Sequence, residues 1–224
     1  MTRIGFARVA FAVCASGSAQ AEVKQASADG FVLQMSAAVQ ARSDAIWAAL
    51  VQPAHWWSSE HTWSGKAANL RLDANAGGCW CERWAEGSAE HGRVIMAVPG
   101  TMLRLEAALG PLQELALKGV LTYRIGDADG DSHRLELEYR VNGASTSGLD
   151  AFAPNVDGVL ALQFARLQRY IESGDPEPPP ARPPAAGVDS EAARRAAIIE
   201  EWRRSAEDEA KKAKGTPPKP TPVP

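Results

Sequence analysis

The sequence predicts an α+β fold in which a curved antiparallel sheet wraps around a long C-terminal helix. Apolar and polar residues alternate repeatedly between Leu70 and Val141, and this alternation is typical of strands with one buried face. No segment of helical length separates the alternating runs, so hairpins rather than crossovers are expected to join the strands. After Pro154 the spacing of the apolar residues becomes that of a helix.

The domain is expected to begin with a strand and two short helices. Residues 31–41 alternate apolar with polar side chains, which predicts a half-buried strand. Ser43 is suited to cap a helix that runs to about Val51. Pro53 then ends this helix or starts the second one.

Six further runs complete a predicted sheet of about six to seven strands. Turn residues such as Gly77-Gly78, Pro99-Gly100 and Gly110-Pro111 separate these runs. The apolar positions that define them are Leu70/Leu72, Trp80/Trp84, Val94/Met96/Val98, Leu103/Leu105, Leu117/Leu121/Tyr123/Ile125 and Leu135/Leu137/Tyr139/Val141.

The last predicted element of the domain is a long amphipathic helix over residues 154–172. Its apolar stripe consists of Val156, Leu160, Phe164, Leu167 and Ile171. Pro154 suits the first turn of a helix, and Gly174 suits its end. The helix can bury this stripe only against the concave face of the sheet.

Composition and charge are those of a globular protein. The chain has 224 residues, of which 45% are hydrophobic and 23% are charged, so it is long enough to bury a core. Residues 22–174 carry eighteen acidic and thirteen basic side chains, which gives no electrostatic reason to expect a nucleic-acid partner. No run of about 18 apolar residues occurs, so no transmembrane segment is expected.

Residues 1–21 have the features of a secretory signal peptide. Arg3 and Arg8 provide positive charge, and a short apolar stretch covers residues 9–15. Ala19-Gln20-Ala21 then fits the rule for a cleavage site, with Glu22 as the first residue of the mature chain. We therefore expect a periplasmic or secreted protein, with the folded domain over residues 22–174.

The C-terminal segment divides into three parts. Residues 175–188 are rich in proline and are expected to form a semi-rigid linker. Residues 189–214 are expected to form a charged helix with too few large apolar residues to fold alone. Residues 215–224 are expected to be a disordered Pro/Lys tail. This segment is either a solvated helix or a weak contact site for a protein or an envelope polymer.

Two cysteines, Cys79 and Cys81, lie in the domain. Alternate residues of a regular strand lie about 6.5–7 Å apart, at or beyond the range of a disulfide. Two thiolates are half of a usual tetrahedral metal set, and no nearby Cys or His spacing completes it. We therefore expect two small buried residues rather than a bridge or a metal site.

Two short segments and the closing helix resemble the helix-grip superfamily. The segments are Gly77-Gly78-Cys79-Trp80-Cys81-Glu82 and Leu109-Gly110-Pro111-Leu112-Gln113-Glu114-Leu115. The superfamily includes START lipid-binding domains, pollen-allergen-type proteins, polyketide cyclases and proteins similar to heat-shock-protein ATPase activators. The resemblance covers about residues 27–174 and points to a bacterial subgroup of unassigned activity. It implies a cavity between the long helix and the sheet that holds an apolar or aromatic molecule, and it implies no single reaction.

Aromatic residues are the first candidates for the wall of such a cavity. Six tryptophans fall between positions 47 and 84, and a flat apolar ring with one N–H donor suits both a core and a ligand pocket. Filling of the junction between helices and sheet is the alternative role. The expected ligand-binding set is Trp47, Trp56, Trp57, Trp63, Trp80, Trp84, Tyr123, Leu160 and Phe164.

Few residues suggest catalysis. Glu82 is a candidate base if it points inward, because apolar surroundings would raise its pKa; a surface pair or an ion pair with a neighbouring strand is the alternative. His55 is a second weak candidate. His55 and His61 do not have the spacing of a zinc-binding helix, so neither a metal nor a cofactor is expected.

The remaining polar residues give weaker signals for a site. His91 and His133 lie near predicted turns and are expected to be solvated. No Gly-x-Ser-x-Gly segment provides a nucleophile. Arg104 is a polar candidate for the cavity.

The sequence favours an exported monomer that binds a small hydrophobic molecule or lipid. An enzyme of the cyclase or hydrolase kind that uses the same cavity is the first alternative. A protein-interaction module resembling the ATPase activators is the second, and export argues against it because cytosolic chaperones would be out of reach.

Overall fold

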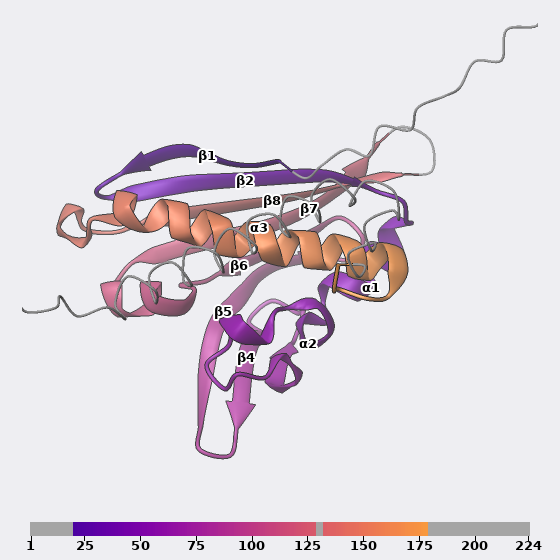
Figure 1. Ribbon diagram of the computed structural model, residues 1–224, viewed down its shortest axis with the longest axis horizontal. Coiled ribbons are helices and arrows are strands. Elements are labelled where there is room, and N and C mark those ends of the chain that lie inside the picture. Colours follow the sequence, from indigo (N-terminus) through magenta and orange to yellow (C-terminus); the bar gives the residue numbers. More distant parts are fainter. Residues whose placement is uncertain (1–19, 129–131, 179–224) are drawn as a thin grey trace, which may run out of the picture. The chain divides into compact units, whose positions relative to one another are not determined.

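A computed structural model describes residues 20–128 and 132–178, which form an eight-stranded antiparallel sheet with helices on its concave side (Figure 1). In chain order the strands are β1 (Gln20–Ser27), β2 (Gly30–Val39), β3 (Leu70–Leu72), β4 (Cys79–Trp84), β5 (Gly87–Val98), β6 (Met102–Glu106), β7 (Lys118–Asp127) and β8 (His133–Asn142). Their order across the sheet is β1-β2-β8-β7-β6-β5-β4-β3. The expected signal peptide up to residue 19, most of the linker, the tail helix and the Pro/Lys tail lie outside the described residues.

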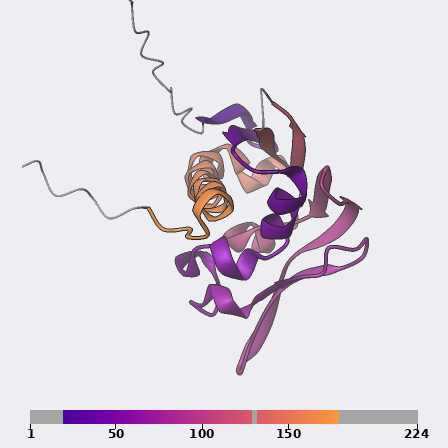
Figure 2. The same ribbon diagram turned by 90° about the vertical axis from the view of Figure 1, so that its right-hand side faces the viewer.

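Three α-helices pack on the concave side of this sheet. They are α1 (Ser43–Leu50), α2 (Pro53–Trp56) and α3 (Leu149–Ser173). Figure 2 looks along α3 and shows the sheet curving around it. Leu160, Phe164 and Leu167 of α3 are buried in the core that this arrangement encloses. This is the helix-grip fold, so the predicted fold class is confirmed. None of the described helices combines the length and apolar character that crossing a bilayer requires.

All the strands that apolar alternation predicted are present, and β1 is an additional strand. β1 pairs with β2 through partners such as Glu22 with Gln34 and Ala26 with Phe31. Its sequence has few apolar residues, so alternation gave no signal there, and the β2 edge supplies the backbone partners that fix it as a strand. A chain that begins at Glu22 would keep most of this strand.

The long helix begins earlier than its apolar stripe predicted. It starts at Leu149, directly after Gly148, so Pro154 lies in the second turn rather than in the first. Its end is as expected, because Gly174 adopts a left-handed conformation and its N–H donates to the carbonyl of Tyr170. The chain then folds back, since Arg169 Nε donates to the carbonyl of Pro176 at 2.9 Å.

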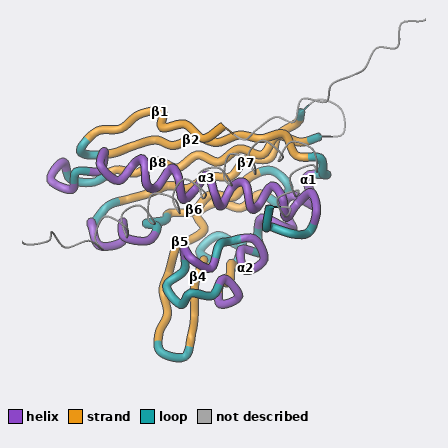
Figure 3. Tube along the Cα trace, viewed as in Figure 1, coloured by secondary structure: helices purple, strands orange, loops and turns teal. Residues whose placement is uncertain are grey.

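A β-bulge in β5 interrupts its pairing with β4. Trp80 pairs with Gly92 and Cys81 pairs with Glu90, so His91 is an extra residue on β5. The β4–β5 hairpin extends away from the rest of the sheet (Figure 3). The bulge has a structural consequence, because His91 and Gly92 are both buried although they are adjacent in a strand.

A disulfide joins Cys79 to Cys81, so the expectation of two unbridged buried residues is wrong. Both cysteines are half-buried, and their Cα atoms lie 5.4 Å apart, which is shorter than the spacing in a regular strand. The reason is local: the pair lies at the bulge, where the strands depart from regular pairing.

Candidate functional site

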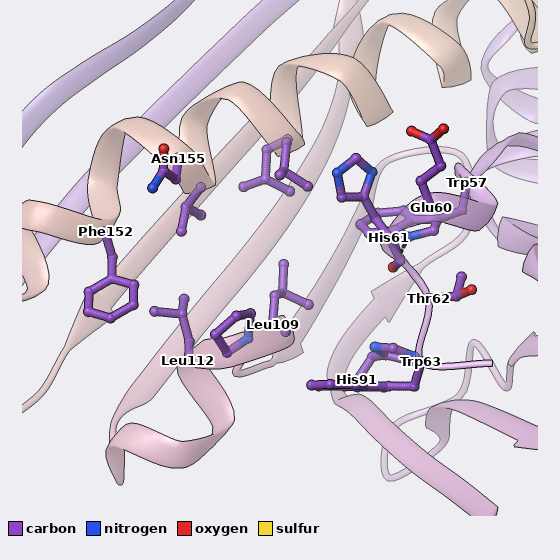
Figure 4. Close-up of a pocket in the computed structure, with 15 residues that line it drawn as sticks. Trp57, Glu60, His61, Thr62, Trp63, His91, Leu109, Leu112, Phe152 and Asn155 are labelled. Atoms are coloured by element: carbon purple, nitrogen blue, oxygen red, sulfur yellow. Dashed lines mark hydrogen bonds between the residues drawn. The ribbon is translucent and has the colours of Figure 1, made fainter. Parts of the chain in front are cut away.

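A cavity of about 440 Å³ opens between α3, the segment after α2 and the short helix η3 (Gly110–Leu115). Most of its wall is apolar. The lining residues are Trp57, Glu60, His61, Thr62, Trp63, His91, Leu109, Gly110, Pro111, Leu112, Phe152, Asn155, Val156, Val159 and Leu160. Figure 4 shows His61 and His91 at one end of the cavity and Phe152 and Leu112 at the other. The site therefore has an apolar end and an end with two imidazole rings.

Behind the imidazole end lies Glu82, whose side chain is fully buried. Its carboxylate accepts hydrogen bonds from the backbone N–H of Trp63 at 3.0 Å and of Ser64 at 2.5 Å, and Oε2 lies 2.9 Å from His91 Nε2. Burial alone would raise the pKa of Glu82, but these hydrogen bonds outweigh burial and hold the pKa below its usual value. Glu82 is therefore ionised at neutral pH.

His91 is the polar residue of the site that sequence reasoning missed. It was expected in solvent near a turn, but it is only 5% exposed and it lines the cavity. The bulge explains the difference, since one extra residue in β5 turns this side chain to the concave face. One signal was present in the sequence: two residues rather than one separate the outward-facing Glu90 and Arg93.

The contact with Glu82 fixes the proton on the His91 ring. An ionised carboxylate can only accept, so His91 Nε2 must carry a hydrogen and donate it. In the neutral ring Nδ1 is then an unprotonated acceptor, and it has no hydrogen-bond partner among the described residues. Trp80 packs against the ring with centroids 5.4 Å apart. The contact with Glu82 thus holds the His91 ring in place and leaves one ring nitrogen as an acceptor.

His61 has the opposite character, and Gln163 on α3 is the cause. The backbone N–H of Ser58 can only donate, so the Gln163 oxygen faces it, at 2.8 Å. The Gln163 amide nitrogen is consequently directed to His61 Nδ1, at 3.0 Å. Nδ1 accepts that hydrogen bond, so in the neutral ring the proton lies on Nε2. His61 is therefore a donor, and Trp57 steadies its backbone by donating to its carbonyl at 2.9 Å.

The expected ligand-binding residues fall into two groups. Trp57, Trp63 and Leu160 line the cavity, with Trp63 half exposed at 50%. The others lie outside the lining: Trp56, Trp80, Tyr123 and Phe164 are buried in the core, Trp47 packs against its edge, and Trp84 is half-buried at the far end of the β4–β5 hairpin.

Two of these core aromatics have unusual polar groups. Burial raises the pKa of the Tyr123 hydroxyl far above its usual value, so Tyr123 stays protonated. Trp80 Nε1 is buried and no described residue offers it an acceptor. Its ring contacts Trp57 and His91, both of which line the cavity.

His55 and Arg104 lie away from the cavity wall. His55 is exposed and stacks on Tyr170, with ring centroids 5.8 Å apart. Arg104 donates through Nε to the Thr122 hydroxyl at 3.1 Å. Of the two residues named as weak catalytic candidates, the structure therefore places only Glu82 next to the cavity.

One group of possible metal ligands occurs in the described part of the chain. The sulfur atoms of Cys79 and Cys81 and a carboxylate oxygen of Glu90 lie within 4.8 Å of one another. Both sulfurs belong to the disulfide, so they offer no thiolate in this oxidation state.

Comparison with solved structures finds proteins that match most of this chain. A protein from Arthrobacter aurescens is 11% identical, with a TM-score of 0.49 over 75% of this chain and 99% of its own. A conserved protein of unknown function from Enterococcus faecalis is 10% identical, with a TM-score of 0.48 over 81% and 91%. CalU16 from Micromonospora echinospora is 18% identical, with a TM-score of 0.44 over 72% and 88%. At these identities no residue role is transferred to this chain.

No family model matches the sequence, and no curated protein matches it.

Proposed function

We propose that this protein binds a small, mainly apolar molecule in the cavity between α3, the segment after α2 and η3. The observation that carries the proposal is a cavity of about 440 Å³ with an apolar wall and two oriented imidazoles at one end. Sites for small molecules have this size, and they combine apolar walls with a few placed polar groups. The resemblance of residues 77–82 and 109–115 to START-like proteins supports the same class of ligand.

Binding is tested with N-phenyl-1-naphthylamine, a neutral apolar fluorophore. We expect saturable binding of one molecule, with quenching of tryptophan emission because Trp57 and Trp63 line the cavity. Val159→Trp should abolish binding by filling the cavity. Leu162→Trp is the matched control, since Leu162 is exposed on the same helix. Equal binding by the filled variant would contradict the proposal.

Export belongs to the same proposal. A disulfide persists in an oxidising compartment such as the periplasm, and residues 1–21 have the features of a signal peptide. The test is the intact mass of the protein from the periplasmic fraction. We expect a chain that begins at Glu22; an uncleaved chain confined to the cytosolic fraction would oppose export. Extraction of the same sample identifies any molecule that copurifies.

The contact between His91 and Glu82 favours a second candidate, an enzyme of the cyclase or hydrolase kind. A buried imidazole that donates to a carboxylate and keeps its other nitrogen unprotonated can act as a general base. Turnover of the copurified molecule would then be lost in His91→Gln and retained in His55→Ala. Equal turnover by both variants would exclude His91 as the base.

A further inference from the structure

The β4–β5 hairpin carries a second group of side chains with ligand atoms, on the face away from the cavity. Cys79 and Cys81 alternate along β4 with the buried Trp80 and Glu82, so both cysteines face the other side of the sheet. Glu90 on β5 pairs in register with Cys81, and paired residues of an antiparallel ladder present their side chains on the same face. Two sulfur atoms and a carboxylate therefore meet on this face.

The donor atoms of these three residues are close enough to share one metal ion. Both sulfur atoms and a carboxylate oxygen of Glu90 lie within 4.8 Å of one another, and Cys79 Sγ is 3.8 Å from Glu90 Oε2. Around a tetrahedral zinc ion, a sulfur and a carboxylate oxygen are about 3.6 Å apart, and two sulfurs are about 3.8 Å apart. Once the disulfide is reduced, rotation about the Cα–Cβ bonds allows the sulfurs to separate to this distance.

We propose that Cys79, Cys81 and Glu90 form a zinc site that operates only when the disulfide is reduced. A dithiol reductant supplies the two electrons: its own thiols become a disulfide, and the Cys79–Cys81 bond is replaced by two thiols. Each thiol then releases a proton as its sulfur binds Zn²⁺, and Glu90 supplies the third ligand. This site is separate from the cavity, so it stands or falls independently of the proposed function.

The mixture of ligands favours zinc over other common ions. Thiolates suit copper(I) and zinc, carboxylates suit magnesium, calcium and manganese, and zinc accepts both types. Among the described residues no fourth His, Cys, Asp or Glu joins this group, so water takes the remaining position. Solvent reaches the site, because Glu90 is exposed and the cysteines are half-buried. Three protein ligands and one water are an established arrangement for zinc.

Two arginines reduce the repulsion among the three anionic ligands. Arg93 pairs in register with Cys79 and forms an ion pair with Glu90. Arg71 on β3 pairs in register with Cys81. Their positive charges offset part of the negative charge that two thiolates and a carboxylate bring together. A carboxylate has two oxygens, so Glu90 can bind the ion through one oxygen and keep Arg93 on the other.

Zinc binding is measured on the untagged full-length chain with the substitution Cys14→Ser. The chain has three cysteines, so this substitution leaves Cys79 and Cys81 as the only thiols. One sample is reduced with dithiothreitol, which is then removed without oxygen, and a second sample stays oxidised. Both are titrated with Zn²⁺ against a chromophoric zinc chelator. We expect the reduced protein to take one zinc ion from the chelator and the oxidised protein to take none.

Glu90→Gln tests whether the carboxylate belongs to the site. The amide keeps the size of the side chain but is a poor zinc ligand, so we expect zinc to bind at least about tenfold more weakly. Glu86→Gln is the matched control, because Glu86 is an exposed carboxylate of the same hairpin outside the group. Its affinity for zinc should equal that of the parent chain.

Three outcomes would overturn the proposal. Equal zinc uptake by the oxidised and reduced samples would show adventitious binding at the surface only, and no uptake by the reduced sample would show that no site forms. Equal zinc affinity of Glu90→Gln and Glu86→Gln would remove Glu90 from the site. If Glu90→Gln does not fold, Co²⁺ decides on the parent chain. The reduced protein must then show a thiolate-to-cobalt charge-transfer band, which carboxylates and imidazoles do not produce, together with the visible bands of tetrahedral cobalt.

Discussion

Glu82 is a buried carboxylate whose partners are amide and imidazole groups rather than a lysine or an arginine. It joins three parts of the chain, because it lies on β4 and accepts from the 63–64 segment and from His91 on β5. Hydrogen bonds to the ionised form keep such a group charged. Glu82 therefore fixes both the backbone of the cavity wall at Trp63 and the orientation of the His91 ring.

We expect Glu82→Gln to lower the free energy of unfolding by about 2–3 kcal/mol at pH 7. The two carboxylate oxygens accept three hydrogen bonds, whereas the glutamine amide has only one acceptor oxygen. The folded-state pKa of Glu82 lies below the unfolded value. Its stabilising effect is thus present above the unfolded pKa and is lost as the pH falls through the folded pKa.

Urea titrations of wild type and variant at pH 7 and near pH 4 measure this effect. The difference between the two proteins should shrink at the lower pH. Glu86→Gln, at an exposed position in the turn of the same hairpin, is the control and should change little. An equal difference at both pH values would assign the loss to packing rather than to charge.

Asp157 on α3 differs from Glu82, because its pKa is raised rather than lowered. It is half-buried, its Oδ1 has no hydrogen-bond partner among the described residues, and burial raises its pKa. The unpaired charge is destabilising above the unfolded pKa, and the penalty grows until the pH passes the folded pKa. Below the unfolded pKa the penalty disappears.

Asp157→Asn should therefore raise the free energy of unfolding at pH 7, by roughly 1 kcal/mol. The gain should vanish near pH 3, where both the folded and the unfolded chain carry a protonated Asp157. Chemical denaturation at the two pH values measures it. Asp127→Asn serves as an exposed control. A variant less stable than wild type at pH 7 would show that Asp157 has a stabilising partner.

At the scale of elements, the bulge of β5 depends on the small size of Gly92. A Cβ at this position would lie 2.9 Å from the Cβ of Ala107 and 2.9 Å from the carbonyl oxygen of Glu106. The second of these atoms belongs to the backbone of β6, which cannot move without disturbing its pairing. The approach of β5 to β6 beside His91 therefore requires glycine.

Gly92→Ala should destabilise the protein by about 1–3 kcal/mol, because the strands would have to move apart at the bulge. Thermal unfolding followed by circular dichroism gives the effect. Gly126→Ala, in β7, is the matched control, since a Cβ there would meet no atom within 4 Å. If both substitutions cost the same, the close approach at Gly92 is not the cause.

Local periodicity predicted most of the elements, and contacts between distant segments explain what it did not predict. The strand over residues 31–41 and the stripe of α3 were readable because each buries one face. The inward direction of His91 depends on a single extra residue in β5. A pattern of alternating apolar and polar residues cannot distinguish such a bulge from the end of one strand and the start of another. The contact of Gln163 with His61 joins positions 102 residues apart, and no local pattern encodes it.

At the scale of the whole molecule, the described domain continues past α3 with a short segment, in which Asp175, Pro176 and Glu177 contact the helix. Arg166 forms an ion pair with Glu177, at 2.6 Å, and Arg169 binds the carbonyl of Pro176. The described residues also belong to one compact unit. These contacts extend the described domain past the end of the helix, to Glu177.

A chain that ends at Pro178 should unfold cooperatively, with a stability within about 0.5 kcal/mol of the full-length protein. A chain that ends at Gly174 loses both arginine contacts and should be up to about 1 kcal/mol less stable than the longer truncation. Urea denaturation of the two truncations and the full chain provides the comparison. A large loss in the longer truncation would show that residues 179–224 stabilise the domain.

The bulge also determines how such a site can be lost in evolution. Removing one residue from β5 would restore regular pairing with β4 and turn His91 away from Glu82, while the sheet and the apolar walls would remain. A single-codon deletion, rather than a substitution at His91, is thus sufficient to remove the imidazole from the cavity while the apolar walls remain. Among related genes, the length of this hairpin should indicate whether the side chain at the position of His91 faces the cavity.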